Sequence, residues 1–270
     1  MSEAPAPRPV ALITGASAGI GVALARVFAA NGHELVLVAR RERKLVELAD
    51  TIAATGRARP HVSALDLTRT DAAAQIAVEL AQHGLEPQYV VNNAGFGLYG
   101  DAAELPLAEQ LAMIDLNVRA LAELSLAFIN SLTRRRGGIL NVASVASYLP
   151  GPGMAVYYAS KAFALSFGEA LHEELSHRGI CVTTLCPGPV PTEFQARAGI
   201  KKFIAPALLV QSSDAVAAKG YAALMRGQRV VVPGFANHAA TLAMRLAPRS
   251  LLAKIVARRQ RGDTLPSTDS

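Results

Sequence analysis

Short apolar runs alternate with longer segments of helical periodicity along most of the chain. The runs are rich in Val, Ile and Leu, which is typical of buried strands, and they cover residues 10–14, 34–39, 62–65, 89–91, 139–143, 180–185 and 229–232. Between them, apolar residues recur at helical spacing in stretches that end near residues 30, 83, 135, 177 and 226. Strands that alternate with helices pair in parallel, so the pattern predicts an α/β fold with one parallel sheet of about seven strands and helices on both faces.

The last part of the chain follows a different pattern. After Pro233, apolar positions such as Leu242, Leu246 and Ile255 recur at helical spacing, and Pro248 divides them into two helical pieces. Six Lys or Arg and two Asp lie in this part, so it carries +4 of the chain's net charge of +6. We therefore expect residues 234–270 to form a basic amphipathic extension, which packs on the body, on another subunit or on a membrane surface.

Composition limits the classes of protein that fit. Of the 270 residues 51% are hydrophobic and 18% are charged, which is enough apolar material for a sizeable core, and no apolar run is long enough to span a bilayer. Residues 1–8 are Pro-rich and have no apolar segment, so they predict a disordered lead-in that is neither a signal nor an anchor. The basic residues are not interleaved with aromatics as in nucleic-acid domains, so no nucleic-acid partner is expected.

The cysteines and histidines indicate neither disulfides nor metal. Cys181 and Cys186 are an odd number of residues apart, on opposite faces of a strand, so they should not pair with each other. Reduced core cysteines fit a cytoplasmic protein. The six histidines are scattered without ligand spacing, so no metal site is predicted.

A glycine-rich turn follows the first predicted strand. Gly15, Gly19 and Gly21 occupy a G-x-x-x-G-x-G spacing and open a helical segment. Glycines let the backbone approach a pyrophosphate, and a helix N-terminus offers free N–H groups to it. Such turns also simply cap helices, but strand, glycine turn and helix together favour a Rossmann-type, doubly wound dinucleotide fold.

Two arginines follow the second predicted strand, where an acidic residue would accept the ribose hydroxyls of NAD. Arg40 and Arg41 instead favour the 2′-phosphate of NADP(H) over NAD(H), because a guanidinium binds phosphate through two N–H groups. The alternative is that both arginines begin a solvated helix.

Polar residues also end the third and fourth predicted strands. Asp66 is placed to accept a hydrogen bond from the adenine amino group, or else it caps the next helix, a role open to Thr68 and Thr70 as well. After the fourth strand, Asn93 and Gly95 suit a close approach to a ligand, and the amides are able to lock this turn to its neighbour, although ordinary turns use the same residues.

A phenol and an ammonium share one face of a later helix. Tyr157 and Lys161 are four residues apart, and Ser144 follows the strand at 139–143. We expect the cation to lower the pKa of Tyr157, which would make the phenol a proton donor and acceptor near neutral pH. This spacing also occurs on ordinary surface helices. Asn117 lies among apolar residues and needs hydrogen-bond partners, either as a structural bridge or by holding a water in a proton path.

With these motifs in order, the sequence resembles the short-chain dehydrogenase/reductase family over roughly residues 9–233. The resemblance rests on TGASAGIG (14–21), NNAG (92–95), Asn117, Ser144, YYASK (157–161) and PGPVPT (187–192). It implies that Tyr157 donates or removes a proton, that Ser144 hydrogen-bonds the reacting oxygen, and that Lys161 lowers the tyrosine pKa and binds the nicotinamide ribose. Asn117 would hold a water in a proton relay. Position 18 is Ala where some NADP-users carry a basic residue, which leaves Arg40 and Arg41 to hold the phosphate.

Family resemblance and residue chemistry together define the expected site. The catalytic residues are Asn117, Ser144, Tyr157 and Lys161. The residues expected to hold the cofactor are Gly15, Ser17, Ala18, Gly19, Ile20, Gly21, Arg40, Arg41, Asp66, Leu67, Asn93, Ala94, Gly95, Tyr157, Lys161, Pro187, Gly188, Val190 and Thr192.

We therefore expect an NADP-dependent oxidoreductase that acts on a ketone or aldehyde and the matching secondary alcohol. Residues 9–233 would form one catalytic domain with a flexible substrate lid at about 189–211, and a homodimer or homotetramer follows from the resemblance. The alternative is a non-catalytic NADP-binding regulatory or scaffold protein of the same fold, but such proteins commonly lose the tyrosine or lysine that this chain keeps.

Overall fold

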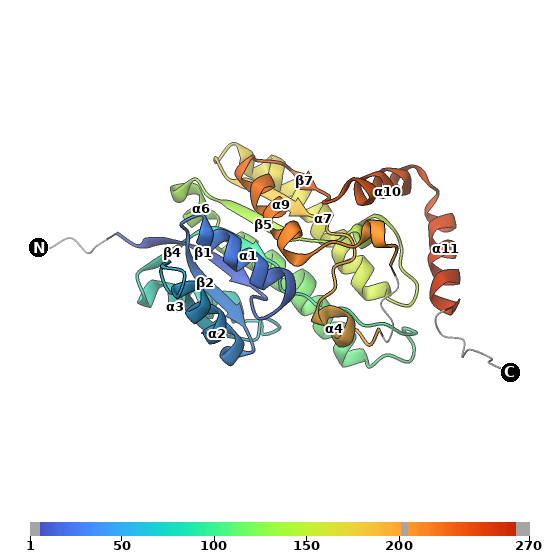
Figure 1. The fold of residues 1–270 in the computed structure, drawn as a ribbon, viewed down its shortest axis with the longest axis horizontal. Helices are drawn as coiled ribbons and strands as arrows, with labels where there is room; N and C mark the ends of the chain where they lie inside the picture. Colours follow the sequence, from blue (N-terminus) through green and yellow to red (C-terminus); the bar gives the residue numbers. More distant parts are fainter. Residues whose placement is uncertain (1–5, 201–204, 263–270) are drawn as a thin grey trace, which may run out of the picture.

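One parallel sheet of seven strands organises the molecule (Figure 1). The structure is a computed structural model that describes residues 6–200 and 205–262. The strands are β1 (Arg8–Thr14), β2 (Glu34–Ala39), β3 (His61–Ala64), β4 (Leu85–Asn92), β5 (Gly138–Val142), β6 (Cys181–Leu185) and β7 (Val230–Val231). Their order across the sheet is β3-β2-β1-β4-β5-β6-β7, and every neighbouring pair is parallel. This confirms the predicted Rossmann-type fold.

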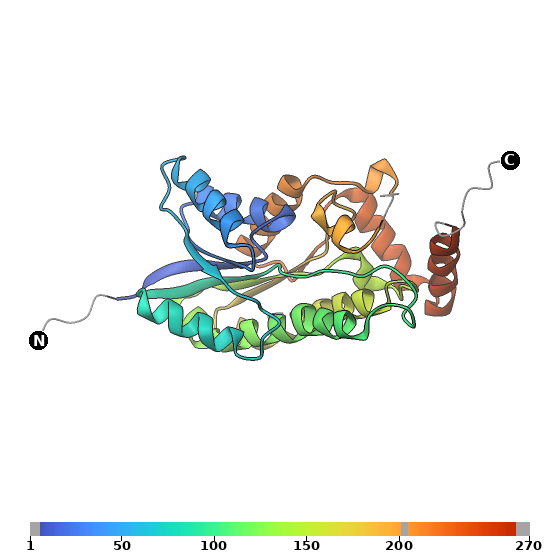
Figure 2. The same cartoon turned by 90° about the horizontal axis from the view of Figure 1, so that it is seen from below.

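Helices cover both faces of the sheet. They are α1 (Gly19–Ala30), α2 (Glu42–Ala53), α3 (Ala72–Gln82), α4 (Leu107–Ile114), α5 (Leu121–Ala127), α6 (Ile129–Arg135), α7 (Ala155–Ser176), α8 (Glu193–Arg197), α9 (Ser213–Met225), α10 (Phe235–Leu246) and α11 (Arg249–Gly262). Apolar side chains of α1, α2 and α9 form the core on one face, and those of α3, α5, α6 and α7 form the core on the other. Figure 2 shows the sheet between these two layers.

The sequence placed every strand but not every boundary. β4 begins at Leu85, earlier than the predicted residue 89, although Pro87 interrupts the apolar pattern. Proline has no N–H for the ladder, and the register with β1 shifts opposite it, between Val10 and Ala11. The buried side chains of Leu85 and Pro87 keep this segment in the sheet despite the proline.

The predicted helix at 106–135 is broken into pieces. α4 leads into a π-helical turn, η1 (Asp115–Ala120), and α5 and α6 are separated at Phe128. π-helical turns are rare and concentrate at functional sites. Asn117 lies within η1 and is 1% exposed.

The tail consists of α10 and α11, which meet at Ala247 and Pro248. α10 packs against two short 3₁₀ turns of the body, η2 (Val145–Tyr148) and η3 (Ala207–Leu209), and Asn237 and Thr241 on this helix are buried. Both views place α11 beyond α10, at the end of the molecule (Figures 1 and 2). The first half of the extension therefore packs on the body, which is one of the three alternatives that the sequence leaves open.

Some predictions fall on residues that the structure does not describe. These are residues 1–5 of the lead-in, 201–204 of the lid and 263–270 of the tail. Within the described ranges, none of the helices combines the length and apolar character that crossing a membrane requires.

Candidate active site

The glycine turn between β1 and α1 forms a tight cradle. Gly15 and Gly19 have positive φ angles of 66° and 54°, which favour glycine. A Cβ on Gly21 would lie 2.2 Å from the carbonyl oxygen of Gly15, so no side chain fits there. Ala18 precedes α1 and supplies no side-chain cap, which leaves the helix N-terminus to an external anion. The turn therefore fits the pyrophosphate of a dinucleotide.

This cradle is locked to the turn after β4. The Asn93 Nδ2 amide donates to the carbonyl oxygens of Thr14 (2.9 Å) and Gly15 (3.2 Å). The Thr14 hydroxyl accepts from the backbone N–H groups of Asn93 and Ala94 and donates to Val91. The predicted lock between the two turns is confirmed. It lies between β1 and β4, where the strand order reverses and ligands of such sheets bind.

Of the two arginines after β2, only Arg41 contacts the cradle. Its guanidinium donates to the Ser17 hydroxyl at 3.0 and 3.2 Å and to the Ser17 carbonyl oxygen at 3.2 Å. Arg40 is exposed and has no side-chain partner in the described part of the chain. Arg41 is therefore the better placed of the two for a phosphate beside the glycine turn.

Asp66 lies in a local turn after β3. Its Oδ1 accepts from the backbone N–H of Thr68 (3.0 Å) and from the Thr68 hydroxyl (2.9 Å), while Leu67 is buried beside it. The following helix α3 begins at Ala72 after Asp71. None of the three predicted capping residues is thus at the N-cap, because the turn at Asp66 delays the start of the helix.

Ser144 and Tyr157 come together at the end of β5. The Ser144 Oγ accepts from the backbone N–H of Ala146 (3.1 Å) at the start of η2. Tyr157 lies in the first turn of α7, close enough to Ser144 for that side chain to lower the pKa of its hydroxyl. The end of β5 and the first turn of α7 thus place Ser144 and Tyr157 at the same site, as the spacing predicts.

The expected lowering of the Tyr157 pKa is wrong for this structure. Burial raises the pKa of Tyr157 to about 12, and the hydrogen bond to Ser144 offsets only part of this. Lys161 lies with its Nζ 5.9 Å from the centre of the Tyr157 ring, so the cation lies over the ring. Desolvation of the phenolate is therefore the dominant effect.

Lys161 is a buried ammonium held by the end of β5. It is 6% exposed, and its Nζ donates to the carbonyl oxygen of Val142 at 2.8 Å. Burial lowers the pKa of Lys161 to about 8, while the neighbouring Cys186 thiol acts in the opposite direction. The cation is thus poised to titrate near neutral pH.

Asn117 uses its whole amide as a bridge. Its Oδ1 accepts from the Phe96 N–H (3.1 Å), and its Nδ2 donates to the Phe96 carbonyl oxygen (2.9 Å) and to the Ser160 hydroxyl (3.0 Å). Ser160 in turn donates to the carbonyl oxygen of Tyr157 (2.7 Å). The structure therefore supports the bridging role and ties η1 to the helix that carries Tyr157.

The PGPVPT segment packs between Ser144 and the tail. The Pro187 carbonyl oxygen accepts from the Val145 N–H (3.0 Å), and Val190 is buried. A Cβ on Gly188 would lie 2.4 Å from Oδ1 of Asn237 on α10. Thr192 caps α8 in a capping box. This loop is fixed from both sides.

The predicted lid contains the short helix α8. The ring of Phe194 lies 5.1 Å from that of Tyr157, and a Cβ on Gly97 would meet both Phe194 and Met154 at about 3 Å. Phe194 therefore packs on the tyrosine, and Met154 and Gly97 lie next to Phe194. Of the predicted lid residues, Phe203 and Ile204 lie outside the described residues.

Sequence reasoning missed three groups near the site. Glu193 pairs with Arg41 and Lys44, and Asn237 packs on Gly188. The third group is a row of buried polar residues in register on β4, β5 and β6, in which the Asn92 Nδ2 donates to Oδ1 of Asn141 at 2.9 Å. Only this row had a signal, because Asn141 interrupts an apolar strand.

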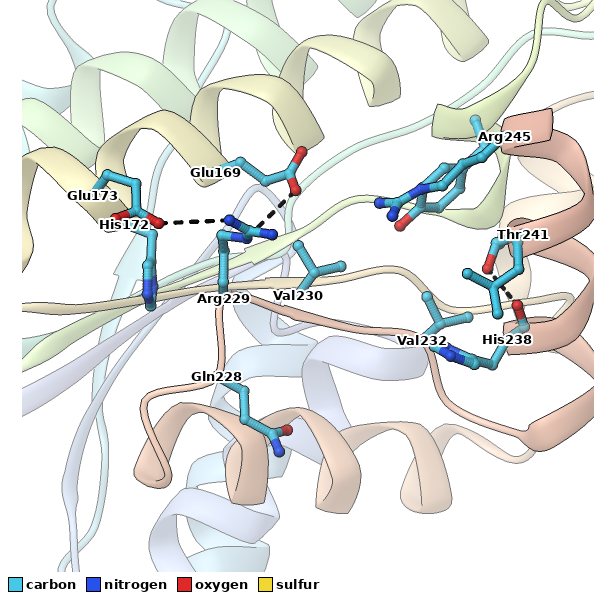
Figure 3. Close-up of a pocket in the computed structure, with 12 residues that line it drawn as sticks. Glu169, His172, Glu173, Gln228, Arg229, Val230, Val232, His238, Thr241 and Arg245 are labelled. Atoms are coloured by element: carbon cyan, nitrogen blue, oxygen red, sulfur yellow. Dashed lines mark hydrogen bonds and ion pairs between the residues drawn. The ribbon is translucent and has the colours of Figure 1, made fainter.

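A separate groove of about 470 Å³ lies at the edge of the sheet, between β7, α7 and α10 (Figure 3). Arg229 at its centre contacts Glu169 (3.6 Å) and Glu173 (3.5 Å), and the Arg245 guanidinium lies over the Tyr148 ring. None of the predicted site residues lines this groove. Within the described part of the chain no cluster of His, Cys, Asp or Glu could hold a metal ion, and both cysteines are free.

Comparison with known proteins gives consistent matches. The family model described as short chain dehydrogenase matches residues 9–202. Sulfoacetaldehyde reductase 2 of Chromohalobacter salexigens is 39% identical over 188 residues, which are 68% of this chain and 74% of that protein. A solved short-chain dehydrogenase from Sphingobium yanoikuyae in complex with NADPH has a TM-score of 0.78 at 30% identity, over 97% of this chain and 98% of the other. The bulky-bulky ketone specific alcohol dehydrogenase from Comamonas testosteroni has a TM-score of 0.73 at 26% identity, over 97% and 96% of the two chains. The family match contains every predicted site residue.

Proposed function

The chain belongs to the short-chain dehydrogenase/reductase family, and from this premise we propose an NADP-dependent oxidoreductase in which Tyr157 is the general acid and base. The substrate would be a ketone or aldehyde, or the matching secondary alcohol. The convergence of Ser144, Tyr157 and Lys161 beside the glycine cradle is the observation that carries the proposal.

The residues present fit a nicotinamide dinucleotide. The glycine turn excludes side chains at Gly21 and presents an uncapped helix start to a pyrophosphate, and Asn93 holds the next turn beside it. Arg41 offers a guanidinium at the edge of the turn. When bound, the cofactor would donate or accept the hydride.

The side chains of this protein would manage the proton. In reduction, the Tyr157 hydroxyl donates its proton to the carbonyl oxygen of the substrate, and Ser144 donates a hydrogen bond to the same oxygen as charge develops there. The Lys161 ammonium favours the phenolate that remains on Tyr157. In oxidation the same groups act in reverse, with the phenolate as base.

Preference for NADP is supported by the charge around the cradle. Arg41 is bound to Ser17, and Lys44 lies in the first turn of α2, whereas neither of the two residues directly after β2 is acidic. The NADPH complex of the Sphingobium yanoikuyae relative is consistent with this preference.

An apolar substrate is supported by the groups that cover Tyr157. Phe194 and Met154 come together around Gly97, and Phe96 lies beneath the side chain of Arg197. These groups suit a bulky ketone, the class named for the Comamonas testosteroni relative, more than a small charged aldehyde.

One experiment tests cofactor and reaction together. NADPH and NADH are titrated by fluorescence, and consumption of the preferred cofactor is then followed with acetophenone, cyclohexanone and sulfoacetaldehyde as separate substrates. Tighter binding of NADPH together with turnover of the apolar ketones is expected. Equal or tighter binding of NADH would contradict the phosphate assignment, and binding without turnover of any carbonyl compound would contradict the reaction.

We further propose a homodimer or homotetramer in the cytoplasm. Free cysteines fit a reducing compartment, and the exposed Leu251 and Ile255 on α11 fit a contact with another surface. Light scattering of the full chain and of a chain that ends at Ala247 tests the assembly, and sedimentation with anionic vesicles tests a membrane contact through the extension.

A further inference from the structure

The lid helix α8 is tied to the cofactor side of the cleft by a single carboxylate. Glu193, the first residue of α8, places Oε2 2.6 Å from Nη1 of Arg41 and Oε1 2.7 Å from Nζ of Lys44. Both carboxylate oxygens are therefore shared with cations at the start of α2, about 150 residues earlier in the chain. An anion thus already bridges Lys44 and the guanidinium of Arg41, which contacts the glycine turn.

This carboxylate occupies the donors that a phosphate would use. The Arg41 guanidinium is fixed by Ser17 in the glycine turn and directs its remaining N–H group at Glu193. A phosphate oxygen and a carboxylate oxygen accept from the same N–H fork, so the two anions compete for Arg41. The side chains of Arg41, Lys44 and Glu193 are 45%, 38% and 53% exposed, so solvent reaches the ion pairs and exchange is possible.

The opposite end of α8 is tied to the substrate side. Arg197 pairs with Glu109 of α4 at 3.0 Å and lies over the ring of Phe96 at 4.6 Å. Between the two ends, Phe194 lies against Tyr157. The helix therefore spans from α2 to α4, and a change at Glu193 acts on a segment that covers the catalytic tyrosine.

We propose that Glu193 is an internal competitor of the cofactor's 2′-phosphate and so sets the selectivity between NADP and NAD. A cofactor with the phosphate displaces Glu193 from Arg41 and Lys44 and releases the cofactor end of α8. A cofactor without it leaves Glu193 in place. Lys44 is then the second cation of the phosphate site. This inference rests on the proposed binding of a nicotinamide dinucleotide at the glycine cradle.

The test compares Glu193→Gln with a control variant that makes the same change in charge. Glu47→Gln also removes one negative charge from the region of α2, but Glu47 pairs with Arg43 and contacts neither Arg41 nor Lys44. Calorimetric titration with NADPH, NADH, 2′,5′-ADP and 5′-AMP separates the contribution of the 2′-phosphate to binding from that of the rest of the cofactor. Thermal melting confirms that each variant is folded.

Glu193→Gln is expected to raise the affinity for NADPH and 2′,5′-ADP about three- to fivefold, which is the range of an exposed ion pair. The affinity for NADH and 5′-AMP should stay unchanged. Lys44→Met is expected to weaken the binding of only the two ligands that carry a 2′-phosphate, NADPH and 2′,5′-ADP. Adding Arg41→Ala to Glu193→Gln should abolish the gain in affinity that Glu193→Gln gives alone. Unchanged or weaker NADPH binding in Glu193→Gln would overturn the inference, as would an equal gain for NADH or the same gain in Glu47→Gln. A wild-type chain that binds neither dinucleotide would instead overturn the proposed function.

Discussion

The Lys161 ammonium donates a 2.8 Å hydrogen bond to the carbonyl oxygen of Val142, the last residue of β5. This bond joins the helix that carries Tyr157 to the strand that leads to Ser144. It also fixes the cation over the face of the tyrosine ring, 5.9 Å from its centre. The position of the Lys161 cation is therefore set by the backbone at the end of β5.

Replacing Tyr157 by Phe should remove turnover while cofactor binding persists. The ring that packs on Phe194 is kept, but the hydroxyl beside Ser144 is lost, and positioned acids contribute about 100-fold or more. Initial rates of ketone reduction and NADPH titration measure the two effects. Tyr158→Phe is the matched control, since the adjacent ring packs on Gly151. Activity of Tyr157→Phe close to that of the control would contradict the assigned role.

Ketone reduction should slow as the pH rises through about 8. The pKa of Tyr157, near 12, keeps the phenol protonated, whereas burial lowers the pKa of Lys161 to about 8. Above that pH the lysine is neutral and no longer stabilises the phenolate, so the rate falls although the acid is intact. Rates at saturating NADPH over a pH series measure this. A level profile from about pH 7 to about pH 10 would show that the Lys161 charge is not required.

Asn117→Asp should destabilise the fold. The change keeps the shape of the side chain but replaces the N–H donors to Phe96 and Ser160 by an acceptor in a site that is 1% exposed. Loss of two buried hydrogen bonds should lower the free energy of unfolding by ~2–4 kcal/mol. Urea denaturation measures it, with the same change at the exposed Asn31 as control. Equal stability of the two variants would contradict the bridging role.

Gly188→Ala should disturb both the PGPVPT loop and α10. The new Cβ would lie 2.4–2.6 Å from the amide atoms of Asn237, and overpacking of this kind costs ~1–3 kcal/mol. Asn237→Ala alone loses hydrogen bonds to the carbonyl oxygens of Leu209 and Pro233. Combined, the two changes should cost less than the sum of the single ones, because the amide that the Cβ meets is gone. Strict additivity in thermal and urea unfolding would show that the contact does not matter.

Most of the strands were predictable because each one has a local apolar pattern. Each parallel strand is a short buried run, and the glycine turn after residue 14 marks where the order reverses. The end of β5 and the first turn of α7 could likewise be assigned to one space, since both lie at the carboxyl edge of the sheet.

Other features depended on contacts that spacing does not encode. The ion pair of Arg41 with Glu193 joins residues 152 positions apart, and no spacing in the sequence marks Glu193 as the partner of Arg41. The direction of the Tyr157 pKa shift was wrong because a one-turn separation gives the distance along the helix but not the burial of the phenol. The π-helical turn at Asn117 lies inside a segment that the sequence predicted as one continuous helix.

That π-helical turn makes the helix from α4 to α5 sensitive to length. An α-helix advances about 100° per residue, so the extra residue in η1 rotates α4 relative to α5 by that angle. Deleting one residue from Asp115–Ala120 would restore a regular helix without breaking the chain, yet it would turn Glu109 away from Arg197. The two halves of the helix thus have a fixed angular relation, and this segment should accept no single-residue insertion or deletion.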